Sequence, residues 1–359
     1  MNAPIAGHNP VTKLLQMAAM CLILVAVSIH SVLAQPSLPT LPVQSDAQVR
    51  REWQKAMLKQ GLPKKGCFNA SYPDAAWTEV PCAVAPQIPY LPTHGTAPAT
   101  VGNGTDFSAQ VSGSTYISSA VGSFPRTTNV TSESDGGFSN KFSLQINSGF
   151  FATTACDSAG DPASCKGWQQ FIYSTTSAAA FMQYWLLNYT SSTVTCPAGW
   201  NTYRSGCWKN SSAAAVPAQT ITNLGNLDLT GQAVSAGNDT VTMSVSGTLY
   251  STNGADSVLN LASGWQAAEF NIVGDGDGAE AVFNTGATIR VLTSIDDGTT
   301  NAPSCSPTGY TGETNSLTLG NSCCPTGGTS PGITFMQSTV GTLACPNIAI
   351  IPVFYRLLL

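Results

Sequence analysis

Residues 264–278, GWQAAEFNIVGDGDG, carry the pattern from which the fold of this chain is predicted. Side chains alternate between the two faces of a β-strand. The even positions around Phe270 are mostly apolar and are expected to face a core, whereas the odd positions place Glu269 beside Trp265 on a face expected to line an open groove. The glycine- and aspartate-rich end of the stretch is typical of a turn, and residues 281–295 alternate again. Residues 257–295 are therefore predicted to form a long hairpin.

The composition favours an exported β protein over a helical one. Charged residues make up 9% of the 359 residues, against about 25% in an average soluble domain. Short runs of Val, Ile, Phe, Tyr and Trp alternate with turns rich in Gly, Asn, Ser and Asp. We predict an all-β fold, an antiparallel two-sheet β-sandwich of the jelly-roll, concanavalin-like type, with a short N-terminal helix and a disulfide-rich C-terminal lobe.

One helix and a series of short strands are expected. The helix is predicted over residues 46–60, because Ser45 can cap its start and Gly61 can end it. The predicted strands are Phe107–Val111, Tyr116–Phe124, Lys141–Asn147, Trp168–Tyr173, Phe181–Tyr189, Thr240–Tyr250, Gln266–Val273 and Thr288–Ser294.

The chain is expected to divide into four segments. Residues 1–34 are typical of a signal peptide, because Lys13 precedes an apolar run too short for a stable membrane span and small residues precede a cleavage site after Ala34. The mature protein is therefore expected to be secreted, periplasmic or extracellular, without a stable membrane span. The other predicted segments are 35–100 (basic helix, stapled loop and Pro-rich linker), 101–300 (β-sandwich) and 301–359 (Cys- and Gly-rich lobe).

Cysteine usage agrees with export. Of 11 cysteines only Cys21 lies in the predicted signal peptide, which leaves ten. An even number in an exported chain favours disulfides, although spacing alone leaves their connectivity open. Proximity suggests Cys67 with Cys82, Cys156 with Cys165 and Cys196 with Cys207, with Cys305, Cys323, Cys324 and Cys345 pairing among themselves.

Positive charge is concentrated near the N-terminus. Six of the 14 Lys and Arg residues lie at 50–65, whereas the chain after residue 65 holds seven Lys or Arg and 17 Asp or Glu, a balance of −10. The basic segment is either a solvated helix face or a removable pro-segment that folds onto the acidic body. Because an acidic body repels phosphates, nucleic acid is not expected as a partner.

The scarcity of histidine removes several chemistries. His8 and His30 fall in the predicted signal peptide, which leaves His94 in a proline-rich connector. The sequence has no zinc-ligand spacing, no arrangement for a Ser-His-Asp triad and no nucleotide-binding fingerprint. Asp275 and Asp277 fit a turn better than a calcium loop. No metal and no cofactor is expected, and carboxylate, amide and aromatic chemistry remains.

Glu269 and Gln145 are the leading candidates for that chemistry. Of the five glutamates after residue 65, Glu269 lies most clearly inside a predicted strand. In the strand predicted at 141–147, Phe142, Leu144 and Ile146 face one layer, so Gln145 lies on the other. The two polar side chains are expected to meet in one groove.

Four short segments resemble the glutamic peptidases, both the eqolisins and the plant neprosin-type enzymes. They are FSLQIN at 142–147, CKGWQQ at 165–170, QYWL at 183–186 and AEF at 268–270. The resemblance extends over about residues 113–295, and the Asp-Gly-Asp loop of the eqolisins is not recognisable before Gln145. The chain also resembles uncharacterised bacterial secreted proteins, which imply no function.

The resemblance implies a two-sheet β-sandwich that cleaves polypeptides in acid. It places Gln145 where the family has its strand-borne Gln or Glu, and Glu269 at the family's later Glu. Glu269, its pKa raised by burial beside Trp265, would be the general base, and Gln145 would position water and stabilise the oxyanion. The predicted substrate contacts are Trp168, Gln183, Trp185 and Trp265.

Two other functions fit the same residues. A non-catalytic sandwich could bind a glycan or another surface by stacking Trp168, Tyr184, Trp185 and Trp265 on sugar rings. A glycosidase would use Glu269 with a second carboxylate about 5 to 10 Å away. The sequence leaves this choice and the oligomeric state open.

Overall fold

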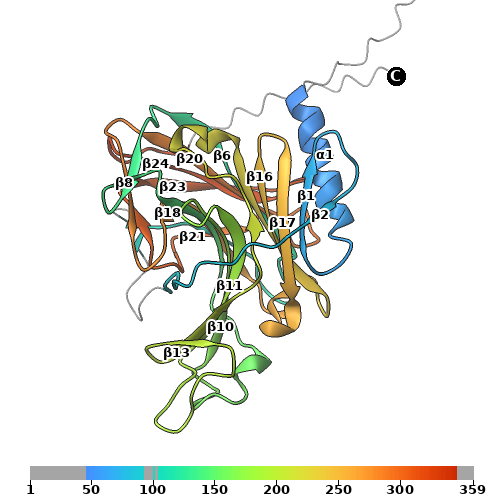
Figure 1. The fold of residues 1–359 in the computed structure, drawn as a ribbon. Coiled ribbons are helices and arrows are strands. Elements are labelled where there is room, and N and C mark those ends of the chain that lie inside the picture. Colours follow the sequence, from blue (N-terminus) through green and yellow to red (C-terminus); the bar gives the residue numbers. More distant parts are fainter. Residues whose placement is uncertain (1–45, 93–99, 102–103, 346–359) are drawn as a thin grey trace, which may run out of the picture. The chain divides into compact units, whose positions relative to one another are not determined.

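A computed structural model describes residues 46–92, 100–101 and 104–345. The predicted signal peptide, His94 and the apolar C-terminal tail lie outside these residues. Within them, two nine-stranded sheets form the body of the protein, and all their strand pairs are antiparallel (Figure 1). The all-β sandwich predicted from sequence is thus confirmed.

The first sheet has the strand order β2-β1-β17-β16-β15-β6-β20-β24-β23. Its strands are β1 (Cys67–Ser71), β2 (Thr78–Val80), β6 (Ser119–Thr128), β15 (Leu227–Gln232), β16 (Asn238–Val245), β17 (Thr248–Ala255), β20 (Thr288–Asp296), β23 (Thr318–Thr326) and β24 (Gly332–Ser338).

The second sheet has the order β12-β13-β11-β10-β9-β18-β5-β21, with β14 also paired to β11. Its strands are β5 (Ser108–Gln110), β9 (Phe142–Ser148), β10 (Lys166–Ser174), β11 (Ala179–Leu187), β12 (Asn201–Tyr203), β13 (Gly206–Asn210), β14 (Ala214–Ala215), β18 (Ala267–Gly274) and β21 (Ser304–Ser306).

Smaller elements connect the two sheets. A four-stranded sheet contains β7 (Glu133–Asp135), β8 (Phe138–Ser139), β19 (Glu280–Phe283) and β22 (Thr314–Asn315), and β3 (Thr100–Val101) pairs with β4 (Gly104–Thr105). The helices are α1 (Asp46–Gln60) and the short 3₁₀ turns η1 (Thr154–Cys156), η2 (Ile221–Asn226), η3 (Asp256–Val258) and η4 (Leu261–Ser263).

The main core lies between the two large sheets. Phe270 of β18 packs on Phe124 of β6 with ring centroids 5.0 Å apart. This close approach requires glycine at position 122, because a Cβ there would lie 2.1 Å from the Phe270 ring. The apolar even positions of the opening stretch therefore face the core, as their alternation predicts.

The long hairpin predicted over residues 257–295 is wrong. β18 pairs with β9 and β5 in the second sheet, whereas β20 pairs with β6 and β24 in the first. Both edges of β18 are already occupied, so the chain after the turn at 274–278 passes through β19 to the other layer. The strand predicted at 240–250 is instead a hairpin of β16 and β17, because Ser246 and Gly247 turn the chain with positive φ.

Helix α1 has the predicted bounds, and it packs against the first sheet. Its Met57 forms a small cluster with Ala70 of β1 and Leu249 of β17, separate from the main core. Arg50 lies over the Tyr72 ring at 5.4 Å. The basic segment is thus seated beside β1, β2 and β17 (Figure 1), and not over the second sheet.

All five disulfides expected among the ten cysteines are present. Three join the pairs predicted from proximity, and the last four cysteines pair among themselves. The bonds are Cys67–Cys82, Cys156–Cys165, Cys196–Cys207, Cys305–Cys323 and Cys324–Cys345. In the described part of the chain no helix has both the length and the apolar character needed to cross a membrane.

Candidate functional site

A line of polar side chains crosses the second sheet on the face opposite the main core. Consecutive strands align these residues one against the next, so that each strand supplies one member. We call this line the polar row. In order across the sheet it consists of Ser108, Glu269, Asn147, Gln170, Gln183 and Asn210.

Strand alternation produces this row. The residues that flank its members along each strand, such as Ile146, Phe171 and Phe270, enter the core between the sheets. A residue one position away must then face outward. Five of the six row members are nevertheless buried, Glu269 with 0% of its surface exposed, and Asn210 at the end of the row is half-buried. Polar side chains that solvent does not reach need hydrogen-bond partners, and here these must come from another layer of the protein.

Glu269 is held by three donors on one of its two carboxyl oxygens. Its Oε2 accepts from Asn147 Nδ2 at 3.1 Å, from the Tyr310 backbone N–H at 2.7 Å and from the Thr311 N–H at 3.2 Å. The other oxygen, Oε1, has no hydrogen-bond partner. The carboxyl is thus oriented through one oxygen, while its second oxygen accepts no hydrogen bond in the covered state.

Asp106 lies against Glu269 and changes its acidity. Asp106 accepts from Asn271 Nδ2 at 2.9 Å and from the Phe107 N–H at 2.7 Å. The charge of each buried carboxyl acts on the other. Burial and then the negative charge of Asp106 raise the pKa of Glu269 well above its usual range. Burial raises the pKa of Asp106 to about 7. In such a pair the ionisation of one carboxyl opposes the ionisation of the other.

Gln145 lies on the same face of the same sheet as Glu269, on the neighbouring strand. It is aligned with Asn271, one step along the strand from the Asn147–Glu269 pair. Its Nε2 donates to Ser143 Oγ at 3.0 Å and to Glu313 Oε2 at 3.4 Å. The structure therefore brings the two predicted residues to one face, but the amide in contact with Glu269 is that of Asn147.

Three of the four predicted substrate-contact residues share this face. Gln183 is in the polar row, and Trp168 pairs with Trp185 in the adjacent row, their rings 6.1 Å apart. Trp208 continues this second row at 6.3 Å from Trp185. All three tryptophans are buried. They form a buried apolar cluster beside the polar row and not an exposed surface on which a ligand could stack.

Trp265 does not belong to the site. It is buried in the main core and stacks on Phe171 with ring centroids 5.4 Å apart. It precedes β18 and follows the turn η4, so the alternation of the strand does not govern its direction. The prediction that Trp265 lies beside Glu269 is wrong, and the raised pKa of Glu269 comes from burial and Asp106 instead.

The face is covered, whereas an open groove was expected. Two segments lie on it: residues 83–92, which we call the strap, and residues 310–313, which we call the cover loop. The strap donates from Tyr90 N to Gln183 Oε1 at 2.7 Å, and the cover loop donates to Glu269. These segments supply partners to Gln183, Asn210 and Glu269 of the polar row, whereas Asn147 Oδ1 and Gln170 Oε1 have none.

Glu313 joins the two covering segments. Its Oε1 accepts from the Leu91 N–H at 2.8 Å and from the Gly278 N–H at 3.1 Å. Its Oε2 accepts from Gln145 and from the Thr311 hydroxyl. Burial raises the pKa of this carboxyl. Glu313 is therefore a third buried acid at the site, and it connects the strap to Gln145.

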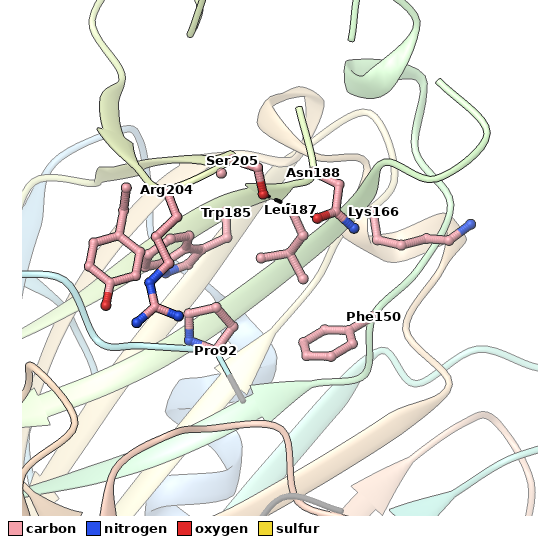
Figure 2. Close-up of a pocket in the computed structure, with 10 residues that line it drawn as sticks. Pro92, Phe150, Lys166, Trp185, Leu187, Asn188, Arg204 and Ser205 are labelled. Atoms are coloured by element: carbon pink, nitrogen blue, oxygen red, sulfur yellow. Dashed lines mark hydrogen bonds between the residues drawn. The ribbon is translucent and has the colours of Figure 1, made fainter. Parts of the chain in front are cut away.

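A cavity of about 320 Å³ opens next to the covered face, at the end of the strap. Figure 2 shows the Arg204 side chain extending toward Pro92, with Phe150 across from it. Phe150 meets the Tyr310 ring edge to face at 5.4 Å. Because Pro92 ends the strap and Phe150 contacts Tyr310 of the cover loop, this cavity adjoins both covering segments.

Sequence reasoning missed Asp106, Glu313 and the strap. Asp106 directly precedes the strand predicted at 107–111 and lies two residues before Ser108. Strand alternation could therefore have placed both side chains on the polar face. No local pattern indicates the strap or Glu313, because both lie in Pro- or Gly-rich connections. Among the described residues, no group of three or more His, Cys, Asp or Glu is placed to hold a metal ion.

Comparisons with known proteins give weak likenesses to solved structures. No family model matches the sequence, and no curated protein matches it. Two solved structures align over 65% of this chain and 98% of their own, each at 14% identity. One is a scytalido-glutamic peptidase with a peptide-based transition-state analogue, at a TM-score of 0.30, and the other is SCP-B of the eqolisin peptidases with the tripeptide Ala-Ile-His, at 0.28.

Proposed function

We propose that this protein is a secreted acid endopeptidase of the glutamic class, with Glu269 as its general acid and base. The arrangement of Glu269 carries the proposal. Asn147 of the neighbouring strand donates to one oxygen, which the cover-loop N–H groups of Tyr310 and Thr311 also hold while the face is covered, and no donor reaches the other oxygen. The adjacent carboxyl of Asp106 raises its pKa. A carboxyl with a raised pKa is suited to take a proton in one step and return it in the next.

The reaction would proceed in two steps. In the first, the oxygen of a water molecule bonds to the carbonyl carbon of the peptide, and the water proton passes to Oε1 of Glu269. In the second, Glu269 returns that proton to the amide nitrogen, the carbon–nitrogen bond breaks, and an amine and a carboxylic acid leave. Neither step needs a metal or an organic cofactor.

Gln145 is the proposed oxyanion donor. It lies on the Glu269 face, and its Nε2 bonds to Ser143 and Glu313 in the covered state. When a substrate replaces the cover, that N–H can turn to the developing negative oxygen. A donor of this kind contributes about 3 kcal/mol to transition-state stabilisation where such donors have been removed.

Catalysis requires that the cover leave the face. Glu269 and Gln145 are 0% and 1% exposed, so no substrate reaches them in the covered state. Removal of the cover would also admit water and lower the pKa of Glu269, because burial is the main cause of its elevation. Opening would therefore produce the ionised base that attack by water needs in mild acid.

The test is cleavage of denatured casein by the mature chain at about pH 3 to 5. We expect Glu269→Gln to abolish cleavage. Glu133→Gln is the matched control, because Glu133 is another buried glutamate with a raised pKa but lies on β7, outside the polar row. Equal cleavage by wild type and Glu269→Gln, or no cleavage by wild type even after the strap is loosened, would refute the proposal.

No observation favours the two other functions. The tryptophans on the Glu269 face are buried, so they offer no exposed platform for sugar rings. A glycosidase needs two carboxyls on either side of an open groove, and Asp106, Glu269 and Glu313 are all buried.

A further inference from the structure

The strap crosses the second sheet along the polar row and heads toward Glu269. Asn210 Nδ2 donates to the Pro86 carbonyl at 2.7 Å, and Gln183 Nε2 donates to the Ile88 carbonyl at 3.1 Å. Gln183 Oε1 in turn accepts from the Tyr90 N–H. The contacts fall on alternate strap residues, the spacing expected of an extended chain. Side-chain amides of the row thus bind the strap through its main chain.

Two buried side chains anchor the strap. Tyr90 is fully buried, lies 5.8 Å from the Phe181 ring and donates its hydroxyl to Asp275 Oδ1 at 2.7 Å. Leu91 packs on the cluster of buried tryptophans that includes Trp185. In contrast, Val84 of the same strap is 82% exposed. The strap therefore fits the face as a ligand does, with a few anchors and an outward-facing remainder.

The strap also controls the cover loop. The Gly312 N–H donates to the Leu91 carbonyl at 2.6 Å, and Leu91 N–H donates to Glu313. Pro92 forms a β-bridge with Thr311, whose own N–H donates to Glu269. Loss of the strap would remove these bonds from the cover loop. The strap and the two donors that cover Glu269 are thus one connected unit.

We propose that the strap is an intramolecular inhibitor, and that the face beneath it binds an extended polypeptide by the same main-chain contacts. The inhibitory role rests on the proposed peptidase function, but binding of a polypeptide to this face can be measured without it. Asn210 and Gln183 would bind the carbonyls of the incoming chain, and the Tyr90 and Leu91 sites would take two of its side chains. The tethered strap competes at high effective concentration, so it excludes a free peptide until it is weakened.

The experiment measures binding of a labelled peptide with the strap sequence, VAPQIPYLP, residues 84–92. All variants carry Glu269→Gln, so that no cleavage interferes. Tyr90→Ala and Leu91→Ala are each made in the full mature chain. We expect each variant to bind the peptide at least about tenfold more tightly than the chain that carries Glu269→Gln alone. Val84→Ala is the matched control, because that side chain is exposed, and it should bind as weakly as the unchanged strap.

Hydrogen exchange provides the second measurement and does not depend on either variant being folded. In the unchanged strap, the Tyr90 and Leu91 amides should exchange faster than those of β9 and β10, and excess peptide should accelerate them further. Exchange as slow as in β9 and β10, with or without peptide, would overturn the proposal. Equal peptide binding by Tyr90→Ala, Leu91→Ala and Val84→Ala would overturn it as well.

The two proposals can fail separately. If the weakened straps bind the peptide as expected, but no variant with Glu269 restored cleaves casein, the binding face stands and the peptidase proposal falls. If casein is cleaved equally by variants with the native strap and with Tyr90→Ala, while peptide binding is unchanged, the peptidase stands and the inhibitory strap falls.

Discussion

Asn147 and Glu269 lie opposite each other on β9 and β18, and Asn147 Nδ2 donates to Glu269 Oε2 at 3.1 Å. This bond lowers the pKa of Glu269 and so opposes the effects of burial and Asp106. Gln145, one step along the strand, does not take part in it. We therefore expect different roles for the two amides on β9 in the proposed reaction: Asn147 lowers the pKa of Glu269, and Gln145 donates to the reacting carbonyl.

Substitution of these two amides should separate their roles. We expect Asn147→Ala to raise the pKa of Glu269 and to move the acidic limb of kcat/KM to higher pH, because the ionised carboxylate loses a donor. Gln145→Ala should lower kcat about 100-fold or more and leave that limb in place. The measurement is a pH profile of peptide cleavage for each variant. Identical shifts in both would contradict this division.

Removal of the neighbouring carboxyl should have the opposite effect on acidity. Asp106→Asn takes away a negative charge that raises the pKa of Glu269, so the acidic limb of kcat/KM should move to lower pH. Asp228→Asn is the control, because Asp228 is an acid with a burial-raised pKa on β15 of the other sheet. An unshifted limb in Asp106→Asn would show that the two carboxyls do not titrate together.

The buried acids predict greater stability in acid than at mildly alkaline pH. Burial raises the pKa of Asp239 and of Glu133 to about 8. A carboxyl whose pKa is raised by folding stabilises the folded state below its unfolded pKa, and this stability is lost as the pH rises through the folded value. The free energy of unfolding should therefore fall between about pH 4 and pH 8, by about 1.4 kcal/mol per unit of pKa difference at most.

Asp239→Asn tests that prediction at one position. Gln169 Nε2 donates to Asp239 Oδ2 at 2.8 Å in the buried space between the sheets, and an amide can accept the same bond without acquiring charge. The variant should unfold at a higher denaturant concentration than wild type at about pH 8 and at a similar one at about pH 4. If the stability of the variant depended on pH as strongly as that of wild type, ionisation of Asp239 would not be the cause of the pH dependence.

The packing beneath Glu269 predicts one strongly destabilising substitution. In Gly122→Ala the new Cβ would meet the Phe270 ring at 2.1 Å, so β6 or β18 must shift. We expect a loss of about 1 to 3 kcal/mol in urea unfolding, together with weaker cleavage, since Phe270 adjoins Glu269. Gly225→Ala is the control, because its nearest neighbour would lie at an ordinary 3.5 Å. Equal stability of the two variants would refute this account of the core.

Local pattern determined which face each strand residue takes. The alternation around Glu269 and Gln145 depends only on backbone geometry, so both residues were expected to face away from the core, and they do. The same holds for helix α1, which has its own cap and stop signals, and for the disulfides that close short loops. Each of these features is fixed by residues close together in the sequence.

Only the tertiary structure decided what lies opposite those faces. The pairing of β18 with β9 and β5, the contact of Asp106 with Glu269 and the strap across the polar row all join residues far apart in the chain. No period in the sequence encodes such a choice, because hydrogen-bonding strand edges accept many partners and total packing selects among them. The prediction for Trp265 was wrong because this residue lies outside the strand, so that packing in the core, and not strand alternation, directs its side chain.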